Sequence, residues 1–396
     1  MKKLILNIIL LSLVSALNAQ TVELWYFEIL TADSSSDKSA ASIINNHSEE
    51  ISGNYKMSVE LAEHFLNNEN YDLFEKTLEI ANKKGELLYF NSINQALKGN
   101  TDLSLKYLSG HLKNATRKLR GEIRSNNAFD KIRNSSKWKE FWQEKHYRER
   151  DINFESALNY FKNEEYQWAL EETDKLINQY PSEDRYYFLK SKILFKTDRL
   201  DKAKNYIEKA IEINSRIEEY HSFAAKIYSD KNKYRKADES TSRALELNPY
   251  TKDHYPLKAR ILNKRGKFRK TEKIFSDIAT VLDDNELKFC VAEAKHNLKK
   301  YTDAIIIMNE LIKRDPSKNK YFNLRGDSFL KTGSYDNASS NYAMSLDIKP
   351  DQPDVYINYG ISKYESGDKE SACYLWKRAL HYKHSKANQY LFRYCK

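Results

Sequence analysis

One spacing constrains the fold of this chain more than any other feature, because a pattern of residue types recurs every 34 residues. Four prolines follow helix-like runs at intervals of 68, 67 and 34 residues: Pro181, Pro249, Pro316 and Pro350. Alanines keep the same period: Ala169, Ala203, Ala237, Ala304, Ala338 and Ala372. An internal period of this length is typical of a repeat array, in which each unit stacks on its neighbours. Such arrays present extended binding surfaces, so binding is favoured over catalysis.

The composition agrees with long helices rather than a loop-rich sheet fold. The 396 residues include only 10 Gly and 6 Pro, whereas 28 Tyr and 17 Phe supply bulky core material. The formal net charge is +10, from 66 basic and 56 acidic residues, which is a mild excess. We interpret this excess as a contribution to solubility, and a polyanionic partner is the alternative interpretation.

The first 19 residues have the layout of a secretory signal peptide. Lys2 and Lys3 precede an apolar run over residues 4–14, and Ala19 supplies the small residue at the expected cleavage site. The run is too short to span a hydrocarbon core of about 30 Å, and no cysteine follows it to accept a lipid. We therefore predict an exported chain, periplasmic or secreted, with no transmembrane segment after cleavage; an uncleaved anchor is the alternative.

Residues 20–54 form a predicted N-terminal segment. The stretch 21–30 is apolar and aromatic, and it fits either a strand or a short helix. The stretch 32–54 is rich in Ser, Asp and Asn, which predicts a weakly structured connector.

Residues 55–149 predict a helical region with degenerate repeats. Apolar spacings indicate two helix pairs, the second with Gly99 at its turn. Two short helices then follow, and we expect them to bury Trp138 and Trp142, although a functional aromatic patch is the alternative.

From residue 150 the period becomes regular and predicts seven units, each with a first (A) and a second (B) helix. The units span 150–183, 184–217, 218–251, 252–284, 285–318, 319–352 and 353–386. Gly326 lies inside an A helix, where glycine costs about 1 kcal/mol relative to alanine. We therefore expect a second helix to approach closely there, with Ala338 as its partner. Residues 387–396 carry apolar side chains at helical spacing and predict a capping helix.

These residues resemble the tetratricopeptide repeat (TPR) superfamily, and the resemblance covers residues 150–386. The unit 319–352 matches its pattern through Phe322, Gly326, Gly333, Tyr335, Ala338, Tyr342 and Pro350. The unit 218–251 matches through Ala225, Tyr228, Tyr234, Ala237, Ala244 and Pro249. The resemblance identifies an exported bacterial TPR protein. It implies an all-α, right-handed superhelical solenoid of antiparallel helix pairs, with a concave groove lined mainly by A helices.

The chain has three cysteines, and consecutive helices of the array run antiparallel. The end of the capping helix, with Cys395, therefore lies beside the start of the last B helix, with Cys373. We predict a structural disulfide between these two residues; two unpaired thiols are the alternative. Cys290, within an A helix, is interpreted as a buried core thiol.

No catalytic constellation stands out in the sequence. The motifs HExxH, GxSxG, GxxxxGK[ST] and GxGxxG are absent, and the nine histidines are scattered without completing a metal site. We expect a protein that is not an enzyme and that has no metal or cofactor.

The predicted groove carries the only graded chemical signal. The ninth position of successive A helices holds Lys192, Lys226 and Arg260, and the thirteenth holds Lys162, Lys196 and Lys264. Toward the C-terminus the ninth position turns acidic, with Glu293 and Asp327, while the basic part is interleaved with Phe154, Phe161, Phe188 and Phe195. The resemblance implies that bases at such positions clamp a peptide carboxylate. We predict a bipolar groove; a solvated lysine-rich face is the alternative.

We therefore expect an exported scaffold that binds a peptide or helix segment of another protein in its groove. Two alternatives stay open: a structural subunit of a cell-envelope complex, and a glycan- or peptidoglycan-associated accessory factor. Lysines among aromatic residues can also bind single-stranded nucleic acid, but export makes such a partner unexpected.

Overall fold

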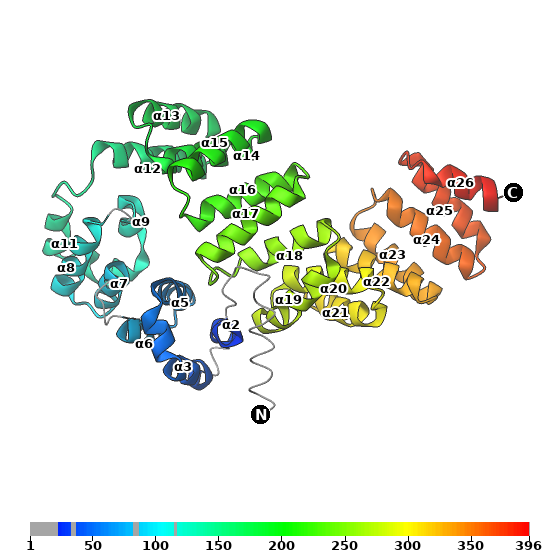
Figure 1. Cartoon of the computed structure of the whole chain (residues 1–396), viewed down its shortest axis with the longest axis horizontal. Coiled ribbons are helices and arrows are strands. Elements are labelled where there is room, and N and C mark those ends of the chain that lie inside the picture. Colours follow the sequence, from blue (N-terminus) through cyan, green and yellow to red (C-terminus); the bar gives the residue numbers. More distant parts are fainter. Residues whose placement is uncertain (1–22, 33–36, 82–86, 115–116, 396) are drawn as a thin grey trace. The chain divides into compact units, whose positions relative to one another are not determined.

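The structure is a computed structural model that describes residues 23–32, 37–81, 87–114 and 117–395. Within these ranges the chain forms helices and no strand, which confirms the all-α helical repeat array (Figure 1). None of the helices in these ranges is both long enough and apolar enough to cross a membrane. The predicted signal peptide, residues 1–19, lies outside the described residues.

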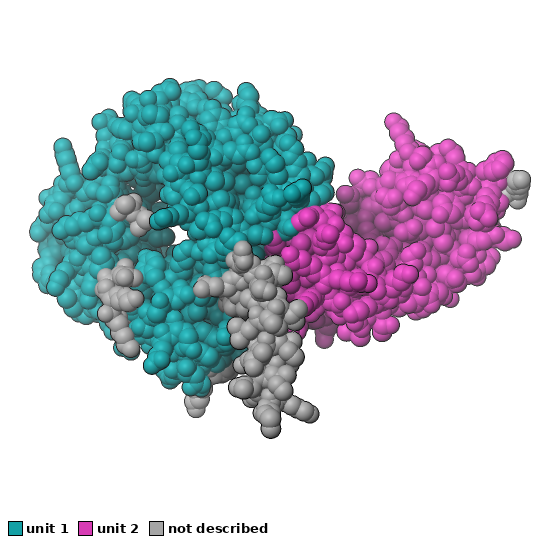
Figure 2. Space-filling view, viewed as in Figure 1, with its two compact units in different colours: residues 1–254 teal, residues 255–396 magenta. Residues whose placement is uncertain are grey.

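The chain divides into two compact units, residues 1–254 and 255–396, shown in teal and magenta in Figure 2. The N-terminal part of unit 1 comprises α2 (Leu24–Thr31), α3 (Asp37–Asn46), α4 (Ser48–Gly53), α5 (Tyr55–Asn67), α6 (Tyr71–Ala81), α7 (Leu88–Leu97), α8 (Thr101–Leu112), α9 (Arg120–Ser125), η4 (Asn127–Phe129), α10 (Asp130–Arg133) and α11 (Ser136–Phe141). Its regular repeats comprise α12 (Glu149–Lys162), α13 (Tyr166–Gln179), α14 (Asp184–Lys196), α15 (Leu200–Ile213), α16 (Glu218–Asp230) and α17 (Tyr234–Leu247).

Unit 2 continues the repeats from the helix that begins at its boundary. It comprises α18 (His254–Lys264), α19 (Phe268–Leu282), α20 (Asn285–Asn297), α21 (Tyr301–Arg314), α22 (Asn319–Lys331), α23 (Tyr335–Ile348), α24 (Pro353–Glu365), α25 (Lys369–His381) and α26 (Lys386–Tyr394). The sequence analysis does not predict the division after His254.

The prediction of a weakly structured connector over residues 32–54 is wrong, because α3 and α4 occupy most of it. The polar composition hides three apolar side chains, Ala40, Ile44 and Ile51, which are all buried. Their burial stabilises the two helices although the local composition favours a loop. The ambiguous stretch before the connector is also helical: α2 buries Tyr26, Phe27 and Ile29.

The two short helices expected near residues 128–142 are present as α10, preceded by η4, and α11. The Trp138 side chain is buried and lies against Phe129 at a ring distance of 5.1 Å. Trp142 is only half-buried, so the expectation that both indoles lie inside holds for Trp138 alone.

Each turn from an A helix to its B helix in the regular repeats contains one residue in the left-handed conformation. These residues recur at the array period: Glu164, Asp198, Asn232, Gly266, Lys299, Gly333 and Gly367. Four of the seven carry a side chain, although that conformation costs about 1 kcal/mol outside glycine. Packing of the two helices, rather than the turn residue alone, therefore fixes the turn.

The close approach expected at Gly326 occurs, but its partner is Tyr342 rather than Ala338. A Cβ atom at Gly326 on α22 would lie 2.8 Å from Cε1 of Tyr342 on α23. The fully buried Tyr342 ring therefore lies directly on the glycine, and its hydroxyl donates to Asp327 Oδ1 at 2.7 Å. The glycine creates room for an aromatic ring, which the one-dimensional pattern of small residues does not reveal.

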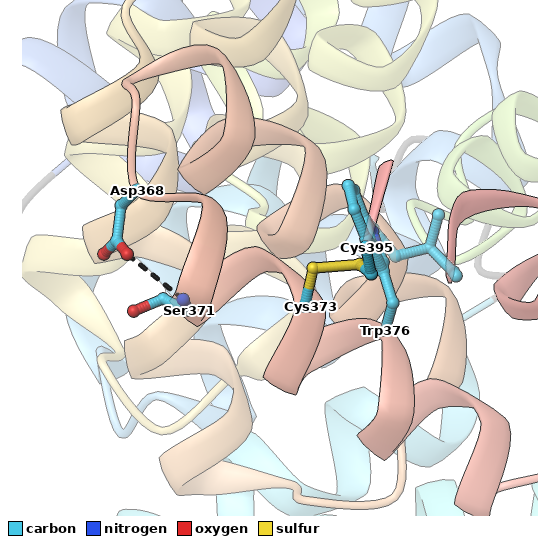
Figure 3. Close-up of a disulfide and its surroundings, with 6 residues drawn as sticks. Asp368, Ser371, Cys373, Trp376 and Cys395 are labelled. Atoms are coloured by element: carbon cyan, nitrogen blue, oxygen red, sulfur yellow. Dashed lines mark hydrogen bonds between the residues drawn. A yellow bond between two sulfur atoms is a disulfide. The ribbon is translucent and has the colours of Figure 1, made fainter. Parts of the chain in front are cut away.

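The last two helices are joined covalently as well as by packing. Cys373 on α25 and Cys395 at the end of α26 form a disulfide, with their Cα atoms 5.7 Å apart (Figure 3). Beside the bridge, the Trp376 ring stacks on Tyr390 of α26 at 5.0 Å. Helix α26 thus covers the apolar end of unit 2 and is fastened at its own C-terminus. Cys290 is a free, buried thiol.

Breaking this bridge should loosen the cap without unfolding the array. The bridge spans 22 residues, so the Cys373→Ser variant should lose about 3 kcal/mol of the free energy of unfolding of this end of the chain. Thermal unfolding with and without reductant measures the effect, and Cys373→Ser/Cys395→Ser should match the single variant. Identical gel mobility and melting of the wild-type chain in both conditions would show that the bridge is absent in solution.

Candidate functional site

Three successive A helices of unit 1 present aromatic rings to one another. Phe154 of α12 meets Tyr186 of α14 at a ring distance of 5.3 Å. Phe188 and Phe195 of α14 both contact Phe223 of α16, at 5.6 and 5.3 Å. These contacts hold the three A helices side by side and leave Phe161, Phe195 and Phe223 partly exposed. We call this surface, together with the lysines described next, the aromatic–basic face.

Four of the predicted groove lysines lie on the aromatic–basic face. Lys192 sits over the rings of Phe161 and Phe188, at 5.8 and 5.0 Å, and its Nζ lies 3.7 Å from Glu219 Oε1. The other three are exposed: Lys162, Lys196 and Lys226. Within the described part of the chain none of these three forms an ion pair. Their charge is therefore available to a ligand, whereas Lys192 is already engaged.

The remaining two predicted bases belong to unit 2. Arg260 and Lys264 are exposed on α18, and Arg260 Nε lies 3.9 Å from Glu286 Oε1. The structure thus brings together four of the six predicted residues on one unit, and the clamp formed by all six stays a prediction.

The acidic positions of the predicted bipolar groove are occupied by contacts within unit 2. Glu293 Oε2 accepts a hydrogen bond from Asn263 Nδ2 at 2.8 Å. Asp327 Oδ1 accepts from Tyr342 and from Asn358 of the next repeat, at 2.7 and 3.0 Å. These carboxylates therefore join neighbouring helices, which explains their presence without a ligand.

Sequence reasoning missed a charge ladder at the start of the regular array. Asp151 accepts from Arg117 Nη2 at 2.6 Å and from Arg185 Nη2 at 2.8 Å, and each arginine is 34 residues away. Burial raises the pKa of the Asp151 carboxyl, but the hydrogen bonds from both guanidinium groups outweigh it and hold the pKa below its usual range. The available signal was the array period itself, extended backward by one unit from Asp151.

A second missed feature is a contact between the two ends of unit 1. The Tyr26 hydroxyl of α2 donates to the Tyr250 carbonyl at 3.2 Å, and the two rings lie 5.0 Å apart. Asn54 Nδ2, at the start of α5, donates to the Tyr250 hydroxyl at 2.7 Å. We call the contacts of residues 24–60 with residues 247–251 the clasp.

Glu60 of α5 supplies the buried centre of the clasp. Its Oε1 accepts from Asn248 Nδ2 at 2.7 Å and from Thr251 Oγ1 at 2.8 Å, while Lys56 donates to the Leu247 carbonyl. Desolvation by burial raises the pKa of Glu60 despite the hydrogen bonds it accepts.

The sequence contains one hint of the clasp, an aromatic residue at Tyr250. The equivalent position of other repeats holds Ser182, Arg216, Ser317 and Asp351.

Comparison with known proteins supports the repeat assignment. The family model described as "Tetratricopeptide repeat" matches residues 184–216 and 219–251, which hold α14 to α17. A search of curated protein sequences found no match. A tetratricopeptide repeat protein from Parabacteroides merdae aligns with 62% of this chain and 99% of its own, at 16% identity and a TM-score of 0.51. The APC/C hetero-tetramer Cut9-Hcn1 aligns with 94% of this chain and 72% of the matched chain, at 14% identity and a TM-score of 0.54. These structural similarities show the fold alone.

Removing one hydroxyl should loosen the clasp. Tyr250→Phe deletes the acceptor of the Asn54 hydrogen bond, so amide exchange in α2 and at the start of α5 should accelerate about fivefold. Hydrogen exchange followed by mass spectrometry measures this. The control is Tyr234→Phe, whose hydroxyl reaches only Asn232 two residues away. Because the two groups share one bond, adding Asn54→Ala should accelerate exchange little further; unchanged exchange in Tyr250→Phe would contradict the clasp.

Proposed function

On the premise that this chain belongs to the tetratricopeptide repeat superfamily, we propose that it binds an acidic segment of another protein on its aromatic–basic face. Tetratricopeptide repeats form protein-interaction scaffolds, and this coarser function follows from the family. The finer proposal rests on one observation: Lys162, Lys196 and Lys226 are exposed and without ion pairs beside partly exposed phenyl rings.

The chemistry of the face favours a ligand that has both carboxylates and apolar side chains. Unpaired lysines form charge-assisted hydrogen bonds with carboxylates, which are stronger than hydrogen bonds between neutral groups. The exposed rims of Phe161, Phe195 and Phe223 offer apolar surface between these charges. An extended peptide or an amphipathic helix can meet both requirements along three successive A helices. We assign no catalytic role to the protein.

Reversing the three free charges tests this proposal. The Lys162→Glu/Lys196→Glu/Lys226→Glu variant should bind the partner at least about tenfold more weakly, with a smaller dependence on salt. The partner is first identified by cross-linking in cells and mass spectrometry, and its binding segment is then titrated as a peptide.

The matched control is Lys145→Glu/Lys202→Glu/Lys233→Glu, which changes the same charge at exposed lysines away from the aromatic–basic face. The control should bind like the wild type. Equal affinity and equal salt dependence in the two triple variants would refute the proposed binding face.

We also propose that the mature chain begins at Gln20 and acts in the periplasm or outside the cell. Residues 1–19 support this by their signal-peptide pattern. The Cys373–Cys395 bridge fits an oxidising compartment. Expression of the full chain, cell fractionation and intact-mass measurement should find the processed form outside the cytoplasm. An unprocessed chain retained in the cytoplasm would contradict export.

A further inference from the structure

A cleft of about 530 Å³ in unit 1 lies apart from the aromatic–basic face. Four segments converge on it: the end of α8, the start of α12, the start of α14 and the loop before α16. Its charged and polar lining includes Lys113, Arg117, Tyr147, Arg148, Arg150, Asp151, Glu183, Asp184, Arg185 and Asn214. The free lysines Lys162 and Lys196 are at the opposite ends of α12 and α14, about 20 Å away along helices of this length.

The three carboxylates of the cleft are all engaged by neighbouring groups. Asp151 accepts from Arg117, from Arg185 and from the backbone N–H of Arg148. Arg150 Nη1 lies 2.9 Å from Glu183 Oε1. The Tyr220 hydroxyl donates to Asp184 at 3.2 Å. Engaged carboxylates fix the positions of the arginines, so the guanidinium groups are held in place before any ligand arrives.

Positive charge remains after these pairs are counted. Five basic side chains line the cleft against three acidic ones, which leaves a surplus of two charges. Lys113 and Arg148 account for this surplus, because neither forms an ion pair within the described residues, and both are exposed. Arg150 Nε also has no hydrogen-bond partner, although the same guanidinium group is anchored to Glu183.

We propose that this cleft binds a compact dianionic group: a phosphate or a dicarboxylate carried by a small molecule. The surplus of two positive charges matches two negative charges on the ligand. Arginine presents N–H groups in a fixed fork that suits the oxygen atoms of both kinds of group. The volume lies in the range of small-molecule sites. A long polyanion is disfavoured, because Asp151, Glu183 and Asp184 would repel charges beyond the first two.

The probes for this site are inorganic phosphate and succinate, titrated into the full mature chain by isothermal calorimetry at constant ionic strength. We expect saturable binding of at least one probe. Binding of phosphate alone assigns a phosphate group, binding of succinate alone assigns a dicarboxylate, and binding of both assigns a site that recognises paired negative charge. Absence of saturable binding by both probes overturns the proposal.

The Lys113→Glu/Arg148→Glu variant removes the surplus and leaves the Arg117–Asp151–Arg185 ladder intact. It should bind the active probe at least about tenfold more weakly, because two charged contacts are lost. The control variant Lys145→Glu/Lys202→Glu makes the same change in net charge at exposed lysines outside the cleft, and its affinity should equal that of the wild type. Equal weakening in the two variants would show that the ions respond to net charge alone and would overturn the site. Circular dichroism establishes that both variants are folded before titration.

Discussion

The structure depends on one constraint: a side chain of one repeat meets a side chain or backbone group about one period further along the chain. Arg117, Asp151 and Arg185 show this directly, since both hydrogen bonds of the ladder join residues 34 apart. Lys320 and Glu286 repeat the same relation in unit 2. A constant period keeps these groups opposite each other through successive units, so local contacts suffice to build the whole array. An insertion of one residue within a helix would displace every contact on that face.

The second constraint is the complementarity of small and large residues between paired helices. Gly326 accommodates the ring of Tyr342, and Gly360 accommodates that of Trp376 in the next repeat. Each pair places an aromatic ring where a methyl group would collide with it, so the helices approach closely and the interior stays dense. At the C-terminal end the same packing continues into α26, where the ring of Tyr390 replaces the helix that another repeat would have supplied.

The clasp gives unit 1 a property that the repeats alone do not supply. Its first described helix and its last repeat are in contact through Tyr26, Asn54, Glu60 and Tyr250. Contacts between residues about 200 positions apart carry a large loop-closure entropy, so they form only after the intervening repeats have folded and brought the two ends together. The N-terminal helices therefore belong to the structure of unit 1, and the aromatic–basic face belongs to a unit whose two ends are joined.

The sequence by itself determined the helical repeat, its period, the residues that begin and end most helices, and the identity of the exposed bases. These features depend on local spacing, and local spacing is visible in one dimension. It did not determine that residues 37–53 are helical, that Tyr342 is the partner of Gly326, or that Asn54 and Glu60 meet residues 248–251. Tertiary structure decided these points, because each depends on which distant surface removes an apolar group from water or completes a hydrogen bond. It also separated the groove bases: Lys192 was already paired with Glu219, while Lys162, Lys196 and Lys226 were left free. Charge is a property of the sequence, but its availability depends on the neighbours that folding provides.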